Sequence, residues 1–188
     1  METERQLLDD LRSGDRQAMR RLYERYSGYA MAVGLRYVPD RNEVRDVLQD
    51  SFVKIFTSID RFEYRGEGSL KSWVTRIVAN EAINHLKQQS HTLFYIEDRA
   101  ELPEQPDTPE ETDDPDVRGV PPDVLTEMIG RLPTGYRLVL NLFVFEQLSH
   151  KEIAQRLGIK ADTSASQFLR AKKRLAQMIK EYLNRQRT

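Results

Sequence analysis

One stretch of the sequence constrains the fold more than any other. Over residues 100–122, six of the chain's eight prolines stand among acidic side chains, with no aromatic residue. Such a segment cannot bury enough apolar surface to offset the entropy lost on ordering, and its like charges repel one another. We therefore expect a flexible, extended linker. In a chain of 188 residues it separates two small folding units, which we place at residues 1–90 and 123–188, with the linker at 91–122.

Apolar residues recur at helical spacing in both halves of the chain. In the N-terminal half they run over residues 19–33, 44–59 and 70–86, with Pro39 ending the first helix and Ser69 placed to cap the last. The C-terminal half shows the same spacing from residue 124 onward. No alternating apolar and polar run competes with these patterns, and no hairpin dipeptide does. We therefore expect an all-α protein made of two small helical domains.

Several classes of function are excluded by what the sequence lacks. It has no cysteine, so disulfides, cysteine-bound zinc and thiol catalysis are ruled out. No apolar run approaches the roughly 18 residues that span a bilayer. The polar start METERQLLDD does not resemble a signal peptide, so we expect a cytoplasmic protein without membrane insertion. His85, His91 and His150 are scattered and lack metal-ligand spacing. We expect no enzyme activity, no metal and no cofactor.

The formal net charge of −1 hides a strong separation of charge along the chain. Residues 97–116 hold ten acidic side chains against one basic side chain, Arg99. From Lys160 onward there are eight basic side chains against two acidic ones, Asp162 and Glu181. Such asymmetry favours a polyanion as the partner of the C-terminal half, and a solvated basic helix face is the alternative.

The stretch LSHKEIAQRLGIKADTSASQF, residues 148–168, is typical of two short helices around a glycine turn. Ser149 stands three residues before Glu152, the spacing of a capping box, and Gly158 supplies the left-handed conformation that a tight turn requires. The second helix is expected to turn one face inward, at Ser164, Phe168, Ala171 and Leu175. Its outward residues are then Thr163, Ser166, Gln167, Arg170, Lys173 and Arg174, with Lys160 just before them.

This layout predicts a helix that reads duplex DNA. Small polar side chains at the helix start meet base edges, and basic side chains further along contact phosphates. Gln167 is expected to pair with adenine through its amide, and Arg170 to contact a phosphate. An ordinary helical hairpin with a basic surface is the alternative. Because few bases and many phosphates are contacted, binding by this half alone should be weak and salt-sensitive.

Two longer stretches resemble one known family. The N-terminal half contains RNEVRDVLQDSFVKIFTSIDRF followed by RGEGSLKSWVTRIVANEAINHLKQQ, and the C-terminal half contains LPTGYRLVLNLFVFEQLSHKEIAQRLGI followed by RAKKRL. These resemble the second and fourth conserved regions of the extracytoplasmic-function sigma factors, the compact promoter-specificity subunits of bacterial RNA polymerase. The resemblance covers most of the chain outside the linker. It implies a protein that binds core RNA polymerase, directs it to specific promoters and promotes DNA melting for transcription initiation.

The resemblance also implies roles for particular residues. Three residues within about one helical turn match the surface that the family docks on the β′ coiled coil of the polymerase: Asp46, Gln49 and Asp50. The β flap is the second expected polymerase contact. Residues implied to bind the single-stranded minus-ten element are Arg61, Phe62, Tyr64, Arg65, Gly66, Gly68, Ser69, Lys71, Trp73, Arg76, Asn80, Asn84 and Lys87. The outward residues of the second helix, with Lys160, are implied to bind the minus-thirty-five duplex.

These residue types suit the capture of an unstacked base. A flipped base needs an aromatic or apolar wall, an amide for its edge and cations for its phosphates. Phe62 and Tyr64 offer the wall, Asn80 or Asn84 offers the amide, and Gly66 lets the backbone approach the nucleotide. The cations expected to meet phosphates are Lys71, Arg76 and Lys87. Trp73 fits either a wedge at the melted edge or the core, and a lone tryptophan on an apolar helix face favours the core.

The second helix departs from the family pattern at its start. Where the family often has Thr-Val-Lys-Ser-Arg, this chain has TSASQ at residues 163–167, so a promoter sequence cannot be carried over from relatives. Two other classes stay open. One is a conventional regulator that uses the same helix pair as a dimer, and the other is a sigma-like decoy that binds regulators and no DNA.

The position of the acidic linker and the identity of a regulatory partner also stay open. The acidic linker either lies in the strongly basic channels of the polymerase or folds back on the basic C-terminal helix and suppresses DNA binding. The resemblance further implies an anti-sigma factor as a partner, because family members are commonly held inactive by one. The sequence does not identify such a protein.

Overall fold

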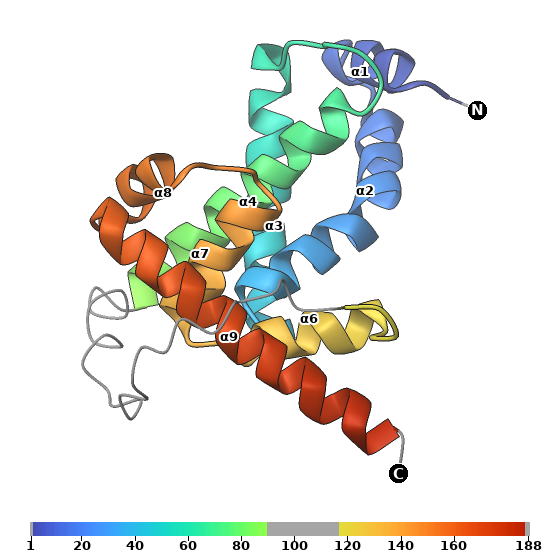
Figure 1. Ribbon diagram of the computed structural model, residues 1–188. Helices are drawn as coiled ribbons and strands as arrows, with labels where there is room; N and C mark the ends of the chain where they lie inside the picture. Colours follow the sequence, from blue (N-terminus) through green and yellow to red (C-terminus); the bar gives the residue numbers. More distant parts are fainter. Residues whose placement is uncertain (1, 90–116, 187–188) are drawn as a thin grey trace. The chain divides into compact units, whose positions relative to one another are not determined.

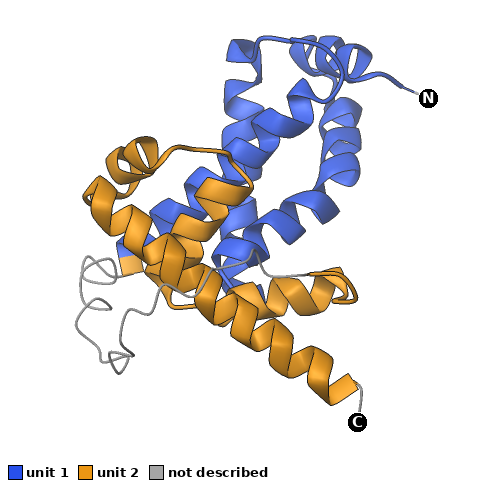
Figure 2. Cartoon of the chain, in the orientation of Figure 1, with its two compact units in different colours: residues 1–88 blue, residues 89–188 orange. Residues whose placement is uncertain are grey.

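The computed structural model describes residues 2–89 and 117–186. The chain divides into two compact units, residues 1–88 and 89–188 (Figure 2). Within the described ranges every regular element is a helix and no strand occurs, so the expected all-α class is confirmed. Most of the predicted linker, residues 91–116, lies outside the described residues. No helix in the described part of the chain is long and apolar enough to cross a membrane.

The first unit consists of α1 (Glu4–Arg12), α2 (Arg16–Tyr37), α3 (Arg41–Ser58), the short 3-10 helix η1 (Ile59–Arg61) and α4 (Ser69–Gln89) (Figure 1). Side chains cap the starts of its first helices. Asp15 accepts from the N–H of Gln17, and Asp40 accepts from the N–H groups of Asn42 and Glu43. Helix α2 ends just before Pro39, as the sequence predicts.

Helix α1 was not among the helices expected from the sequence. It is nine residues long, and Leu7, Leu8 and Leu11, which share one face of the helix, are buried. Its start carries a capping box, in which Thr3 and Gln6 bond each other's backbone and side chain. The helix therefore belongs to the core of the first unit.

The second unit consists of α6 (Pro122–Gly130), α7 (Thr134–Val144), α8 (His150–Leu157) and α9 (Ala161–Gln186). The long helix α9 packs against the other three. Its buried residues join those of α6, α7 and the turn between them in one apolar cluster: Met128, Ile129, Leu132, Tyr136, Leu140, Ala171, Leu175 and Ile179. The opposite face of α9 points away from this cluster and can contact a partner.

The turn between α8 and α9 forms as the sequence predicts. The N–H of Ser149 donates to Glu152 Oε2 at 2.8 Å, and the N–H of Glu152 donates to Ser149 Oγ at 3.3 Å. The hydroxyl of Ser149 also donates to Glu152 Oε2, at 2.6 Å. This bond, followed by the one from the N–H of Ser149, holds the pKa of Glu152 below its ordinary value. Gly158 ends α8 at φ 75°, and its N–H donates to the carbonyl of Ala154. The predicted helix-turn-helix is confirmed.

Candidate nucleic-acid interface

One face of α4 carries six of the thirteen residues expected to bind a single strand. Positions 69, 73, 76, 80, 84 and 87 follow one another at spacings of three and four, so they lie along one side of the helix. Arg76 and Asn84 are exposed, and Trp73, Asn80 and Lys87 are half-buried. We call these five residues the α4 stripe. It combines two amides, two cations and an indole on one surface.

The loop that leads into α4, residues 62–68, is a tight turn held by its own backbone and by one serine. Gly66 and Gly68 have φ values of 111° and 89°, a region that side-chain-bearing residues rarely adopt. The hydroxyl of Ser69 donates to the carbonyl of Gly66 at 2.6 Å and accepts from the N–H of Arg65 at 3.2 Å. Ser69 thus closes the loop, whereas the sequence suggests that it caps α4.

The assignment of Phe62 to a base-stacking wall is wrong. Its side chain is 6% exposed, and its ring centroid lies 5.1 Å from that of Trp73. The two rings pack on each other because the chain turns back onto α4 directly after η1. Trp73 is half-buried, and its indole packs on the ring of Phe62. Phe62 is therefore a core residue that supports the loop and does not face a ligand.

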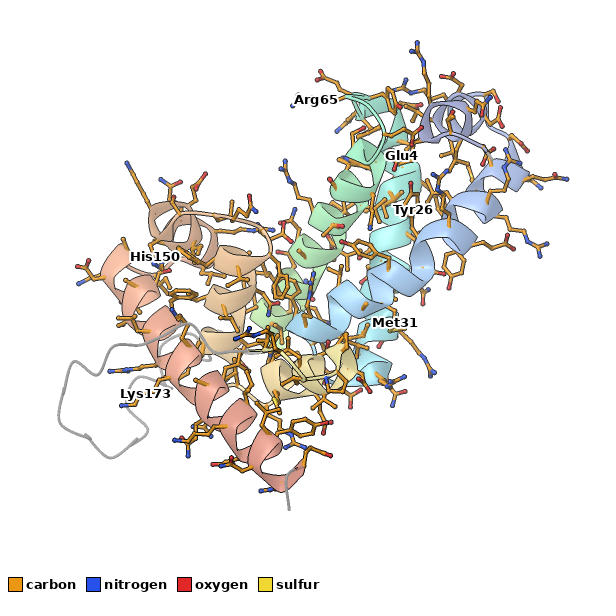
Figure 3. The ribbon with its side chains drawn as sticks, turned by 45° about the vertical axis from the view of Figure 1, so that its right-hand side comes forward. Glu4, Tyr26, Met31, Arg65, His150 and Lys173 are labelled. Carbon is orange, nitrogen blue, oxygen red and sulfur yellow. The ribbon has the colours of Figure 1, made fainter. Side chains whose placement is uncertain are left out.

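Tyr64 is the aromatic residue of the loop that is not buried, and charged side chains surround it. It is half-buried, while Arg61 and Arg65 are exposed. Partial burial, followed by the nearby carboxylate of Glu67, raises the pKa of Tyr64, so the ring stays neutral. The guanidinium of Arg65, which Figure 3 labels at this end of the unit, pairs with Glu63 at 3.1 Å. This end of the unit offers an aromatic face beside cations.

Lys71 does not belong to the α4 stripe. It stands two positions before Trp73, about 200° around the helix, so it lies nearly opposite the stripe. Its ammonium lies 4.1 Å from the ring centroid of Tyr29 on α2, a cation–π contact. The sequence groups Lys71 with Arg76 and Lys87 as phosphate contacts. The structure separates it from them, because helix geometry turns it toward α2.

On α9 the outward face differs from the expected one at Gln167. Its side chain is 3% exposed and packs against Gly135 of α7, where an added Cβ would stand 3.1 Å from its Nε2. Gly135 has no side chain, so α7 leaves room that Gln167 fills. The predicted contact of Gln167 with adenine is therefore wrong.

We expect the change Gln167→Ala to destabilise the second unit by about 2 kcal/mol, because a cavity opens beside Gly135. Chemical denaturation of the full chain measures this loss. In the same variant the preference for one base over another should not change, which a binding assay on duplexes with single base changes checks. A relaxed preference at one position would restore the original assignment.

The inward serine of α9, a departure from the family pattern, has a polar partner. Ser164 is fully buried, and its Oγ lies 3.0 Å from Nδ1 of His150 at the start of α8. The His150 ring in turn stacks on Phe143, with centroids 4.7 Å apart (Figure 3 labels His150). A hydroxyl in the core costs little when it is hydrogen-bonded. His150 and Ser164 thus fix the start of α9 against α8.

The outward face of α9 contains a leucine that was not among the expected residues. Leu169 is 54% exposed, and it lies between Ser166 and Lys173 at spacings of three and four. Thr163 and Ser166 are half-buried on the same side, and the hydroxyl of Ser166 donates to the carbonyl of Thr163 at 3.0 Å. The remaining expected residues are all exposed: Lys160, Arg170, Lys173 and Arg174. We call Thr163, Ser166 and Leu169 with these four cations the α9 face.

Helix α3 exposes the three residues expected to dock on the polymerase. Asp46, Gln49 and Asp50 are all exposed on one side, opposite the buried Val47, Leu48, Ser51 and Phe52. Val53, one turn further along the same side, is 58% exposed. An apolar side chain beside carboxylates and an amide suits a protein partner.

Comparison with known families gives two matches in chain order. Residues 22–92 match the model of Sigma-70 region 2, and residues 123–175 match the model of Sigma-70, region 4. The first match contains α3, the loop and α4, and the second contains the helix-turn-helix.

Relatives with known names match over nearly their whole length. The ECF RNA polymerase sigma-E factor of Haemophilus influenzae is 29% identical, over 94% of this chain and 95% of that one. The RNA polymerase sigma-H factor of Pseudomonas aeruginosa is 28% identical, over 97% and 96%. The ECF RNA polymerase sigma-E factor of Escherichia coli is 28% identical, over 97% of each.

Among solved structures, one entitled "Structure of CnrH in complex with the cytosolic domain of CnrY" matches at a TM-score of 0.49 and 22% identity, covering 96% of this chain and 99% of that one. The two regions in order and the named relatives agree with the surfaces described on α3, α4 and α9. The chain belongs to the sigma-70 family of RNA polymerase sigma factors, in its extracytoplasmic-function group.

Proposed function

We propose that the two units of this sigma factor recognise different parts of one promoter. As a sigma factor the chain binds core RNA polymerase and directs it to promoters for transcription initiation. A domain of residues 1–90, within the first unit and its edge, takes the melted minus-ten strand, and a domain of residues 123–188, within the second unit, takes the minus-thirty-five duplex. The observation that carries this division is that each unit presents one surface of cations and hydrogen-bonding groups, the α4 stripe and the α9 face.

The chemistry of the first surface suits a single strand. A base that leaves the stack lies against Tyr64 at the start of α4. Nucleotides further along the strand meet the amides of Asn80 and Asn84, and Arg76 contacts the phosphates. Because this surface binds an unstacked base better than a paired one, it shifts the melting equilibrium toward open DNA. Opening the promoter in this way needs no catalytic residue, and nucleotide addition belongs to the polymerase.

The chemistry of the second surface suits the major groove. Thr163 and Ser166 lie at the start of α9, where a recognition helix meets base edges. Leu169 offers a branched apolar side chain, which can contact the methyl group of thymine. The cations of the α9 face hold the phosphates on either side.

The α3 surface supports a proposal about the partner. Asp46, Gln49 and Asp50 dock on the β′ coiled coil of core polymerase, with Val53 as an apolar anchor, and the second unit contacts the β flap. Acting with the polymerase places the protein in the cytoplasm. A regulator of the anti-sigma class would silence the chain by covering the α3 surface, since the polymerase needs the same residues.

Two variants of α9 separate base recognition from phosphate binding. We expect Leu169→Ala to reduce the preference for thymine at one minus-thirty-five position by about fivefold, because only the methyl contact is lost. Arg170→Ala should weaken binding to every sequence alike, by about fivefold. The measurement is binding of the holoenzyme to a set of duplexes with single base changes. Equal losses on all sequences for Leu169→Ala would contradict the role given to this residue.

A further inference from the structure

Helix α1 bonds to both ends of the loop of residues 62–68. It lies outside residues 22–92, which match the family model, and it contains none of the residues expected to bind DNA. At the C-terminal end of α1, the guanidinium of Arg12 donates to the carbonyl of Phe62, where the loop begins. At the N-terminal end, Glu4 contacts the residues where the loop becomes α4. In Figure 1 the loop into α4 runs toward α1.

The carboxylate of Glu4 makes an unusually full set of bonds. The residue is 3% exposed. Its Oε2 accepts from the N–H of Gly68 at 2.8 Å and of Leu70 at 3.1 Å. Its Oε1 accepts from the hydroxyl of Tyr26 at 2.8 Å and from the N–H of Lys71 at 3.3 Å. Figure 3 shows Glu4 beside Tyr26, toward the end of the unit that carries Arg65.

The contact is reciprocal. The N–H of Glu4 donates to Oε1 of Glu67 at 3.0 Å, so each residue's carboxylate accepts from the backbone of the other's segment. Tyr26 completes the arrangement from α2. Burial, followed by its bond to Glu4, raises the pKa of Tyr26, so its hydroxyl stays a donor over the physiological range.

This arrangement replaces a local helix cap by a distant one. The first N–H groups of a helix have no intrahelical acceptor, and they attract anions together with the helix dipole. At α4 the anion comes from a residue 64 positions away from Gly68. The position of the loop's last residues is therefore set by α1, and the N-terminus of α4 is not open to a DNA phosphate. A strand must bind along the flank of the helix, where the α4 stripe lies.

We propose that Glu4 is a positioning residue for strand capture: its carboxylate fixes the loop that carries Tyr64 and Arg65 relative to the α4 stripe. This inference rests on the function proposed above for that loop. Glu4 itself does not touch DNA. Loss of this carboxylate leaves the DNA-contacting side chains unchanged but lets the loop move. Binding of the melted strand therefore weakens, while the other contacts of the protein persist.

The test uses the full chain with core polymerase. Glu4→Gln keeps the size of the side chain but removes its charge and turns an NH₂ group toward backbone donors. The probe is a single-stranded oligonucleotide carrying the minus-ten sequence of a promoter that the wild-type holoenzyme uses. We expect about tenfold weaker binding, the effect of disturbing one stacked base. Affinity for core polymerase and for minus-thirty-five duplex should not change.

Asp9→Asn is the matched control, because it removes an exposed carboxylate from the same helix. It should bind the oligonucleotide as the wild type does. If Glu4→Gln also binds like the wild type, the positioning role is refuted while the proposed function stands. If the wild-type holoenzyme itself does not prefer the single-stranded oligonucleotide, the proposed function of the loop fails.

Two physical readouts show whether the effect is local. Amide exchange at Gly68, Leu70 and Lys71 should become faster in Glu4→Gln, with exchange in α3 unchanged. Emission from Trp73, the only tryptophan of the chain, reports the same movement through its contact with Phe62.

Should Glu4→Gln unfold the unit, Tyr26→Phe provides the test instead, since it removes one hydrogen-bond donor to Glu4 and keeps the ring. A smaller loss in the same direction is expected, and unchanged oligonucleotide affinity would contradict the proposal.

Discussion

Replacing Asp46 and Asp50 together by lysine should abolish promoter-directed transcription by this chain with core RNA polymerase. Both carboxylates are exposed on α3, beside Gln49 and Val53. Charges of the wrong sign in a protein interface cost several kcal/mol, and each tenfold loss of affinity corresponds to about 1.4 kcal/mol. We therefore expect binding to core polymerase to weaken by at least about a hundredfold. Competition for a labelled wild-type chain on core polymerase measures the loss directly.

The control reverses two other exposed carboxylates of the first unit, Asp9 and Asp60, which lie outside the α3 surface. It should leave binding to core polymerase within about twofold of wild type, since exposed charges away from an interface contribute little. Both double variants should keep the helical content and the denaturation midpoint of the wild type. A loss of core binding by the control as well would show that total charge, and not the α3 surface, governs docking.

Replacing Lys173 and Arg174 by alanine should weaken binding of the minus-thirty-five duplex on every sequence alike. Both side chains are exposed on the α9 face, close to the middle of the helix. Each phosphate contact releases counterions, so removing two should lower the slope of log affinity against log salt by about 1.8. At physiological salt we expect about a thirtyfold loss. Titration of the holoenzyme with duplex at several salt concentrations measures both quantities.

Lys180→Ala with Arg185→Ala is the matched control, because it removes two exposed cations from the C-terminal end of the same helix. It should change the salt slope by less than about 0.5, since these residues lie one to three turns beyond the α9 face. An equal fall of the slope in the two variants would mean that the whole basic helix attracts DNA without a defined docking position.

The parts of the fold that depend on neighbours in sequence were predictable. Ser149 caps α8 with Glu152, three residues away, and Gly158 ends the helix through its own backbone conformation. The sequence alone therefore predicts the cap and the turn that the structure shows. The exposed side of α3 follows in the same way from the period of its buried residues. Such features need no knowledge of what packs against the helix.

The parts that depend on distant residues were not predictable. Gln167 is polar, and only the missing side chain of Gly135 on α7 makes room for it inside. Phe62 is buried by its contact with Trp73, which the order of residues in the loop does not reveal. Glu4 reaches α4 across 64 positions of chain, and nothing in the residues beside it indicates a buried contact with a distant backbone. In each case tertiary packing overrides the local preference.

The spacing of Leu169 in the sequence predicts an outward position on α9, but its apolar side chain does not suggest a contact with DNA. It lies on the same side of α9 as Ser166 and Lys173, yet polarity alone predicts an outward face of polar and basic residues. A single exposed leucine is common on protein surfaces, so exposure alone does not mark Leu169 as a contact. Its spacing from Ser166 and Lys173 is what groups it with the α9 face.

We propose that this chain gives core RNA polymerase its promoter preference through two separate surfaces. Run-off transcription from a pool of genomic fragments, with purified core polymerase and the full chain, tests it most directly. We expect enrichment of fragments that share two short elements at a fixed separation upstream of the start, and little binding by the chain without polymerase. Transcription that enriches no sequence, or equal enrichment without the chain, would contradict it.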